Sequence, residues 1–368
     1  MALSVGIVGL PNVGKSTLFN ALTRAQNAAA ENYPFCTIEP NKATVPVPDS
    51  RLQPMADLVH PSRIVAATVD FIDIAGLVRG ASKGEGLGNQ FLGNIREVDA
   101  IIHVIRCFDD GDVVHVEGDV DPVRDIGIID TELLLADMES LEKRIDRIGR
   151  QARADKALRA ELAAMEELRA HFDAGKPART FPRDENAPIF NTMHDCRFLT
   201  DKPQIYCCNI SEDALEDIDG NAYVKAVREY AASEHAPVEV IAARMESELV
   251  GMTDEERTEM LESYGLKESG LDCTVRTAYD TLGLISYFTA GPLEVKAWTV
   301  RKGSLAPQAA GVIHSDFERG FIRAEVMSWK DLLKYGGEHK CREEGVLRTE
   351  GKEYVVQDGD VMHFLFNV

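Results

Sequence analysis

Apolar residues along the first 250 positions fall into short runs that are separated by polar and glycine-rich stretches. Five of these runs have the length of a buried strand: residues 3–8, 68–73, 100–106, 204–208 and 238–241. The first run is followed closely by residues 16–22, which are predicted to form a helix. The pattern predicts a domain of the α/β class.

Between the third and fourth runs the apolar spacing becomes that of paired helices. Spacings of four and three residues, which form a heptad seam, recur over two stretches: Leu134, Met138, Leu141, Ile145 and Ile148, and then Leu158, Leu162, Met165 and Phe172. Two helices of about twenty residues would project roughly 30 Å as an antiparallel hairpin. We expect its tip at residues 149–156.

From about residue 281 the period of the apolar positions changes to that of short strands. The predicted strands are residues 284–289, 294–300, 321–327 and 361–366, and Ser328 begins a predicted helix with a capping-box-like pattern. Strands around one helix are compatible with a β-grasp fold. This region has no grouping of nucleophile, base and orienting residue that would indicate a second active site, so we expect a binding role.

Composition places the chain among folded proteins with more than one domain. Its 368 residues suggest roughly two to three domains, and an apolar content of 45% is enough to fill their cores. The 40 Lys and Arg residues against 61 Asp and Glu leave a net charge of −21. Such a charge opposes indiscriminate binding to nucleic acid or to an anionic membrane, so a polyanionic partner would need a local basic patch.

The cysteines and the N-terminus favour a cytoplasmic protein. Seven cysteines, an odd number, are scattered without a C-x-x-C pair, which indicates reduced thiols and not a disulfide framework or a zinc site. The N-terminus enters a predicted strand without a basic leader, and no apolar run approaches the length that spans a membrane. We therefore expect no membrane association.

Residues 9–16, with the sequence Gly-Leu-Pro-Asn-Val-Gly-Lys-Ser, have the G-x-x-x-x-G-K-[ST] spacing of a phosphate-binding loop. Glycines let backbone N–H groups converge on phosphate oxygens, Lys15 would neutralise the β- and γ-phosphates, and the Ser16 hydroxyl would bind Mg²⁺. A strand precedes the loop and a helix follows it, as this site requires. The residues expected around the phosphates are Asn12, Val13, Gly14, Lys15, Ser16 and Thr17.

Two polar segments further along have the composition of nucleotide-dependent switches. Thr37, in a proline-flanked stretch, is a candidate ligand of Mg²⁺ and of the γ-phosphate. Asp73 ends a predicted strand and begins a D-x-x-G pattern that closes with Gly76. Asp73 would hold Mg²⁺ through water, and the Gly76 N–H would contact the γ-phosphate. An ordinary flexible loop is the alternative for the glycine-rich residues 76–88.

The residue that would orient the attacking water is not evident from these motifs. Leu77 stands where Ras-like GTPases have the water-orienting glutamine, so hydrolysis must be slow or must use a group from elsewhere. His115 lies in a polar loop that could position water, although a solvated histidine is the favoured interpretation from the residues alone.

The base-binding motif departs from that of a GTPase. After the strand at 204–208 the chain has Asn209-Ile210-Ser211-Glu212 in place of N-K-x-D, and a later loop contributes the backbone of Ala243. In N-K-x-D the aspartate accepts two hydrogen bonds from guanine. The extra methylene of Glu212 would move the carboxylate beyond hydrogen-bond tolerance, while Asn209 could still reach a purine edge. We therefore expect ATP to be preferred.

Together these motifs resemble the YchF or Obg-like ATPase family, a branch of the Obg-related translation-factor GTPases. The resemblance covers essentially the whole chain and is most specific at residues 9–17, 32–41, 73–92 and 319–326. It implies ATP hydrolysis and three domains. These are a Ras-like P-loop nucleotide-binding domain at 1–128 and 202–280, a helical coiled-coil insertion at 129–201, and a β-grasp (TGS) domain at 281–368.

The resemblance also implies roles for individual residues. His115 falls on the proposed catalytic histidine of the family, which would act with Lys15 in the phosphate loop. Asn12 matches the asparagine that holds a potassium ion in cation-dependent relatives, so K⁺ could take the place of an arginine finger. Ala243 follows a position where the family often has serine and this chain has Ala242, a difference of little weight for a backbone contact.

A basic segment is the candidate contact with RNA or the ribosome. Residues 143–159 carry Lys143, Arg144, Arg147, Arg150, Arg153, Lys156 and Arg159, against Asp146 and Asp155. A surplus of five positive charges in an acidic protein favours a polyanionic partner, and a solvated coiled-coil face is the alternative. The β-grasp domain is a second candidate for contact with RNA, the ribosome or a protein.

Three functions follow from these observations. The first is a Mg²⁺-dependent ATPase whose loops at 32–40 and 76–90 respond to hydrolysis. The second is a nucleotide-gated ribosome or RNA adaptor in which slow hydrolysis only resets the switch, and Leu77 favours it. The third, a GTPase, agrees less well with Glu212.

Overall fold

The computed structural model describes residues 3–30, 41–74, 87–111, 115–152, 155–182 and 186–367. Contacts between Cα atoms divide the chain into two compact units. The first unit consists of Met1–Leu22, Pro40–Ala43 and Phe71–Thr274, and the second of Thr23–Glu39, Thr44–Asp70 and Val275–Val368.

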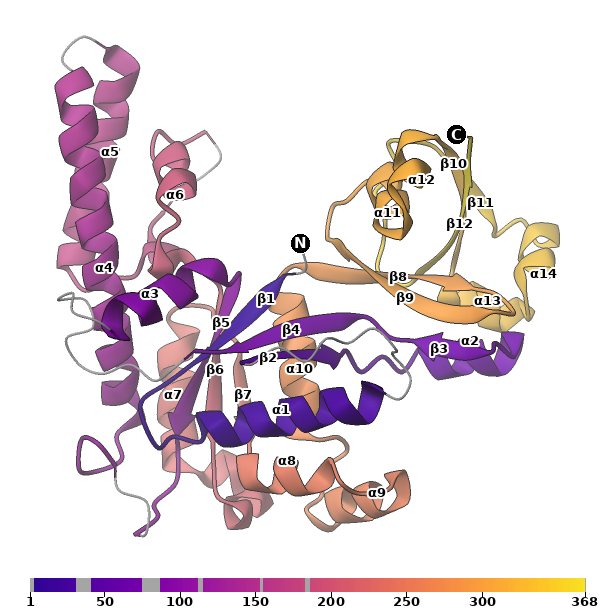
Figure 1. Cartoon of the computed structure of the whole chain (residues 1–368), viewed down its shortest axis with the longest axis horizontal. Coiled ribbons are helices and arrows are strands. Elements are labelled where there is room, and N and C mark those ends of the chain that lie inside the picture. The colour runs from indigo at the N-terminus through magenta and orange to yellow at the C-terminus, as the bar shows by residue number, and fades with distance from the viewer. Residues whose placement is uncertain are drawn as a thin grey trace. The chain divides into compact units, whose positions relative to one another are not determined.

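A six-stranded sheet carries the nucleotide-binding motifs (Figure 1). Its order is β2 (Lys42–Pro46), β4 (Thr68–Asp73), β1 (Ser4–Val8), β5 (Ala100–Arg106), β6 (Gln204–Asn209) and β7 (Val238–Ile241). Pairing is parallel from β1 through β5 and β6 to β7. All seven residues of β5 are buried, since helices cover both faces of a parallel sheet. The five predicted strands are confirmed, and β2 is an addition to them.

The helices of this region follow the strands in the chain. They are α1 (Lys15–Ala30), α3 (Leu87–Glu97), α7 (Ala222–Ala232), α8 (Ala243–Leu249), α9 (Asp254–Ser263) and α10 (Gly270–Thr281). Local chemistry sets two of their starts. The Asn221 side chain accepts hydrogen bonds from the Tyr223 and Val224 N–H groups at the start of α7, and Thr253 forms a capping box with Glu256 at the start of α9.

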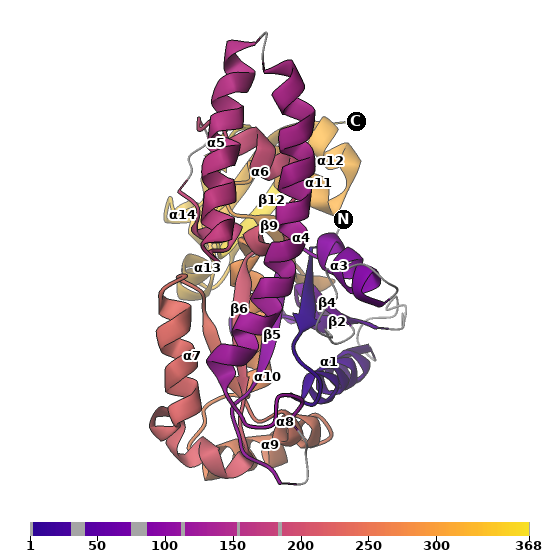
Figure 2. The ribbon, with the colours of Figure 1, turned by 90° about the vertical axis from the view of Figure 1, so that its left-hand side faces the viewer.

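The predicted helical hairpin is formed by α4 (Pro122–Gln151) and α5 (Lys156–Asp173), and α6 (Phe190–Cys196) packs beside it (Figures 1 and 2). All the predicted seam residues belong to one apolar cluster, within which Leu141, Met165 and Leu168 are completely buried. Helix α4 has 30 residues and so is about 45 Å long, longer than the pattern indicated. Ile126, in the first turns of this helix, belongs to the apolar cluster that contains Ile105 and Tyr206 of the nucleotide-binding sheet.

A buried carboxylate attaches the hairpin to the rest of its unit. Asp137 on α4 accepts hydrogen bonds from the backbone N–H groups of Leu199 and Thr200, at 2.7 and 2.8 Å, and from the Thr200 hydroxyl at 2.7 Å. Burial nevertheless raises the pKa of Asp137 to about 6, although these bonds oppose the rise.

The second unit contains a six-stranded sheet of its own. The order is β11 (Arg348–Glu350), β10 (Phe321–Ser328), β12 (Asp360–Phe366), β8 (Leu284–Ala290), β9 (Glu294–Arg301) and β3 (Arg63–Val65). Its helices are α2 (Leu52–Val59), α11 (Ala306–Ile313), α12 (Ser315–Arg319), α13 (Trp329–Tyr335) and α14 (Glu338–Glu343). The four predicted C-terminal strands and the helix after Ser328 are confirmed.

Strand β3 joins this sheet from far away in the sequence. It pairs in parallel with β9, with Arg63 opposite Glu294. Residues 44–70, which the sequence analysis places in the nucleotide-binding domain at 1–128, therefore belong to the compact unit that contains the C-terminal strands. The functional boundaries at 128, 201 and 280 stay a prediction.

Among the described residues, no helix combines the length and the apolar character needed to cross a bilayer.

Candidate functional site

The phosphate loop lies between the end of β1 at Val8 and the start of α1 at Lys15. Gly14 has a φ of +102°, and a Cβ there would lie 2.2 Å from Nδ2 of Asn209, so neither the backbone conformation nor the space admits another residue. A Cβ on Gly9 would lie 2.5 Å from the Val104 carbonyl oxygen. The two glycines thus allow the loop to pass close to β5 and to Asn209, and to present the N-terminus of α1 to an anion.

Lys15 is a buried cation in this loop. Its Nζ donates a hydrogen bond to the Leu10 carbonyl oxygen at 2.7 Å. Burial lowers the pKa of Lys15 to about 8, and the carboxylate of Asp73 partly opposes this shift. Burial raises the pKa of Asp73, and Lys15 opposes it in turn. A buried ammonium group beside a carboxylate and the exposed Ser16 is a chemically suitable donor set for a triphosphate and Mg²⁺.

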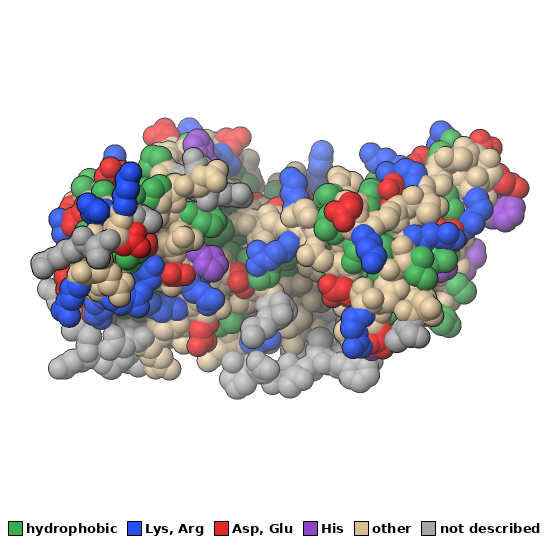
Figure 3. Space-filling model, turned by 90° about the horizontal axis from the view of Figure 1, so that it is seen from above, with side chains coloured by type: hydrophobic (Ala, Val, Ile, Leu, Met, Phe, Trp, Pro, Cys, Tyr) green, Lys and Arg blue, Asp and Glu red, His purple; other side chains and the backbone are tan. Residues whose placement is uncertain are grey.

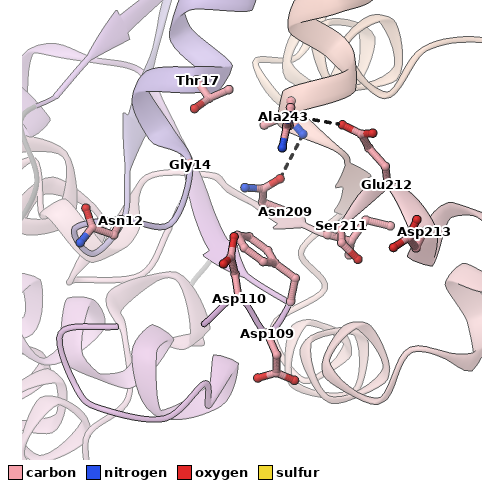
Figure 4. Close-up of a pocket in the computed structure, with 13 residues that line it drawn as sticks. Asn12, Gly14, Thr17, Asp109, Asp110, Asn209, Ser211, Glu212, Asp213 and Ala243 are labelled. Atoms are coloured by element: carbon pink, nitrogen blue, oxygen red, sulfur yellow. Dashed lines mark hydrogen bonds and ion pairs between the residues drawn. The ribbon is translucent and has the colours of Figure 1, made fainter. Parts of the chain in front are cut away.

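A cavity of about 560 Å³ extends from the phosphate loop (Figure 4). That volume lies in the range of small-ligand sites. Four segments that are far apart in the sequence contribute its walls. The lining residues are Asn12, Gly14 and Thr17, then Phe108, Asp109 and Asp110, and then Asn209, Ile210, Ser211, Glu212, Asp213, Ala243 and Arg244.

The Asn209 side chain connects three of these segments. Its Nδ2 donates to the Val13 carbonyl oxygen at 2.9 Å, and its Oδ1 accepts from the Ala243 N–H at 3.1 Å. One amide therefore joins the end of β6 to the phosphate loop and to the start of α8 (Figure 4). Each of the two amide atoms keeps one further hydrogen-bonding position, so contact with a base stays a prediction for Asn209.

The charged side chains that line the cavity are mostly acidic, and Lys15 follows the lining residue Gly14 in the chain. Asp109, Asp110, Glu212 and Asp213 are acidic, and Arg244 is the basic residue among the lining side chains. The Arg244 Nε lies 3.9 Å from Glu212 Oε1, a weak ion pair on an exposed guanidinium. The acidic side chains oppose a phosphate group, and Lys15 attracts one. The arrangement suits a nucleotide with its uncharged base beside the acidic side chains.

Arg106 is a site residue that the sequence analysis missed. This buried side chain at the end of β5 donates hydrogen bonds to the carbonyl oxygens of Phe108 and Asp110, both at 3.1 Å. Its guanidinium carbon also lies 4.7 Å from the centre of the Phe108 ring. Arg106 thereby sets the backbone of the cavity wall at 108–110. The available signal was a charged residue at the end of an otherwise apolar run.

His115 lies apart from the cavity lining. It is buried, and its Nε2 lies 2.8 Å from Oδ2 of Asp125 in the first turn of α4. The structure therefore places His115 beside α4, and His115 is not among the residues that line the cavity. Its catalytic role stays a prediction, as do the roles of Thr37, Gly76 and Leu77, which lie outside the described residues.

Comparisons with known proteins give consistent matches. A family model described as a 50S ribosome-binding GTPase matches residues 4–156, and the YchF-GTPase_C model, described as a protein of unknown function, matches residues 284–367. The chain is 54% identical to the "Ribosome-binding ATPase YchF" of Bacillus subtilis and 50% identical to that of Escherichia coli O157:H7, with all of each chain covered.

A solved structure is similar over nearly the same extent. It is entitled "Structure of the Schizosaccharomyces pombe YchF GTPase" and is 40% identical to this chain, with a TM-score of 0.89. The match covers 99% of this chain and 97% of that one.

Proposed function

The chain belongs to the family of ribosome-binding ATPases named YchF, and from this premise we propose that it binds ATP in the cavity beside the phosphate loop and hydrolyses it to ADP and phosphate. The observation that carries the proposal is the buried ammonium group of Lys15 at the start of α1, in a loop where Gly14 leaves no room for a side chain.

The phosphate end supplies binding and charge neutralisation. Lys15 would leave the Leu10 carbonyl and donate to the β- and γ-phosphates, while the backbone N–H groups of residues 13–17 surround them. The Ser16 hydroxyl and the Asp73 carboxylate would hold Mg²⁺, which would supply positive charge to neutralise the phosphates. Asn12, which has a φ of 62°, is the proposed contact for K⁺.

The base end supplies the preference for ATP. Buried Ile210 takes the place of the lysine of N-K-x-D, and Glu212 lies beside Arg244. A carboxylate paired with a neighbouring arginine, and displaced by one methylene, is poorly placed to accept two hydrogen bonds from guanine. Adenine recognition does not require residue 212 to accept these two hydrogen bonds.

Turnover measured with both nucleotides tests this proposal. We expect kcat/KM to be higher for ATP than for GTP, with Mg²⁺ required and K⁺ more effective than Na⁺. Better binding and faster hydrolysis of GTP would contradict the base preference, whereas equal rates in K⁺ and Na⁺ would contradict only the role of Asn12.

Water activation is assigned to His115. A neutral imidazole can orient a water molecule by accepting its proton in a hydrogen bond. His115 would have to leave Asp125 to do so, and we therefore expect slow turnover by the isolated protein. Replacement of His115 by alanine should lower kcat and leave the affinity for ATP nearly unchanged.

The ribosome is the proposed partner, which also places the protein in the cytoplasm. Lys and Arg side chains gather with a few acids at the left end of Figure 3, where the end of the hairpin faces the viewer. Arg147 and Arg150 of α4 and Lys156 and Arg159 of α5 are exposed. Arg144 is less accessible, because it pairs with Glu161 and Asp195 at 3.1 Å. Arg153 lies outside the described residues.

A nucleotide-gated adaptor is the second candidate function. The observation that favours it is the position of His115, which is engaged away from the cavity. ATP turnover with and without ribosomes separates the two candidates. Strong stimulation by ribosomes favours the enzyme, and unchanged slow turnover with ATP-dependent ribosome binding favours the adaptor.

A further inference from the structure

His115 is held in the protein interior by hydrogen bonds. Its side chain is 2% exposed, although the neighbouring Val116 is 49% exposed. A polar ring is thus buried next to an apolar side chain that faces water. Apolar burial alone would favour a buried Val116 and an exposed His115. The hydrogen bonds of His115 must therefore supply the free energy that keeps its ring buried.

Both ring nitrogens of His115 are engaged. The Glu117 N–H donates to Nδ1 at 3.1 Å, so Nδ1 carries a lone pair and no proton. The proton of the neutral ring is therefore on Nε2, which donates to Oδ2 of Asp125 at 2.8 Å. In this state the ring has no nitrogen left to bind a water molecule.

The Asp125 carboxylate is itself fixed on its other side. Its Oδ1 accepts hydrogen bonds from Nε and Nη2 of Arg124, at 3.2 and 3.1 Å. Arg124 also binds the side chain and the backbone carbonyl of Asp119, at 2.8 and 2.6 Å. Asp125 is also buried, in the first turn of α4. The acceptor for His115 is consequently rigid.

We propose that Asp125 is a positioning residue that retains His115 in a resting position and thereby limits the rate of ATP hydrolysis by the protein alone. The inference rests on the proposed role of His115 in orienting water. Breaking the bond between Asp125 and His115 is then a required step before catalysis, and any partner that accelerates hydrolysis can act by replacing this bond.

The test measures ATP turnover of Asp125→Asn. An asparagine cannot accept from both His115 and Arg124, because one of its two positions is an NH₂ group that would face a donor. A lost hydrogen bond to a charged group changes an equilibrium by roughly tenfold. We expect kcat to rise about three- to tenfold with the KM for ATP unchanged, since the bond lies outside the nucleotide cavity.

The same substitution in a His115→Ala background separates positioning from general loosening of the fold. We expect no acceleration there, because the residue to be released is gone. Asp121→Ala is the matched control: it removes a cap from the same end of α4 without a hydrogen bond to His115, and its turnover should equal that of the unaltered protein. Arg124→Gln, which frees Asp125 Oδ1, should accelerate turnover less than Asp125→Asn does. It is the variant to measure if Asp125→Asn does not fold.

Histidine-selective ¹⁵N spectra give a readout that does not depend on turnover. The His115 signal, identified by its absence in His115→Ala, should show an Nε2-protonated neutral ring whose Nε2 shift changes in Asp125→Asn. An unchanged shift would overturn the inference.

The kinetic outcomes are equally decisive. If His115→Ala is slow and Asp125→Asn is not accelerated, the inference about Asp125 is overturned, and the proposed role of His115 stands. Acceleration that persists without His115 would do the same. Equal turnover of His115→Ala and the unaltered protein would overturn the proposed role of His115 itself.

Discussion

At the scale of single residues, Glu212 decides the expected nucleotide preference through the length of its side chain. Its carboxylate lies near the Arg244 guanidinium, with 3.9 Å between Oε1 and Nε. A shorter side chain would withdraw the carboxylate from Arg244 and return it to the distance from β6 that guanine recognition uses.

We therefore predict that Glu212→Asp shifts the preference toward GTP. The ratio of kcat/KM for ATP over GTP should fall roughly tenfold, the effect of one well-placed charged hydrogen bond. Steady-state kinetics with both nucleotides measure it. Asp213→Glu is a matched control, because it changes the neighbouring carboxylate by the same methylene and should leave the ratio unchanged. A ratio that does not respond to Glu212→Asp would contradict the assignment.

Lys15 leads to a prediction about pH. Its pKa in the free protein is lowered to about 8, and a bound triphosphate stabilises the protonated form and raises that pKa. Binding of ATP at pH 8.5 should therefore take up more than about half a proton, and affinity should weaken as pH rises above 8. Calorimetry in buffers of different ionisation enthalpy measures the uptake.

The comparison for this measurement is pH 7. There Lys15 is already protonated in the free protein, and uptake should fall to about a tenth of a proton. Equal uptake at both pH values would show that another group titrates.

At the scale of elements, exposed side chains of the helical hairpin form the proposed ribosome contact, and buried side chains stabilise the hairpin. The heptad seam accounts for its core, and Arg144 belongs to an internal ion-pair group with Glu161 and Asp195. Charge reversal at exposed positions should therefore change binding without unfolding the hairpin.

We predict that Arg147→Glu combined with Arg150→Glu weakens binding to ribosomes and reduces its dependence on salt. Phosphate contacts release counterions, so binding that uses them weakens as salt rises. Co-sedimentation with ribosomes at several salt concentrations measures this. Lys225→Glu with Arg228→Glu, an equal change of charge on the exposed face of α7, is the control and should bind as the unaltered protein does. Equal co-sedimentation of both pairs would contradict a contact at the hairpin.

At the scale of the whole molecule, the second compact unit depends on a segment from the first fifth of the chain. Arg51 secures that segment: it forms ion pairs with Asp49 at 2.8 Å and Asp358 at 2.6 Å, and its guanidinium carbon lies 4.8 Å from the centre of the Phe288 ring. Both tryptophans of the chain, Trp298 and Trp329, belong to this unit. Tryptophan fluorescence consequently reports its unfolding alone.

We predict that Arg51→Ala lowers the melting temperature seen by tryptophan fluorescence, through a loss of about 1–3 kcal/mol in the free energy of unfolding of this unit. ATP turnover should be retained at temperatures below the transition. Arg63→Ala removes an exposed pair with Glu294 and should change the melting temperature much less. Equal shifts for the two variants would contradict a special role for Arg51.

Local sequence pattern accounts for most of the strands and for the hairpin core. Apolar runs such as 100–106 become strands that are buried on both faces, and the seam from Leu134 to Phe172 packs as the heptad spacing requires. The role of the phosphate-loop glycines was predictable from the sequence for the same reason, since their steric requirement is local. The short strand β3 was not, because its three residues gain stability only by pairing with β9, 231 positions further on.

The sequence by itself determined the chemistry that this protein can offer: a phosphate loop with Lys15, an aspartate at position 73 that ends a strand, and a base motif with glutamate in place of aspartate. Only the tertiary structure decided how those groups are used. It placed Asn209 between the phosphate loop and α8, joined β3 to the C-terminal sheet, and buried His115 against Asp125. The physical reason is that hydrogen bonds and burial depend on which distant segments meet, whereas residue type and spacing limit only what each segment can do alone.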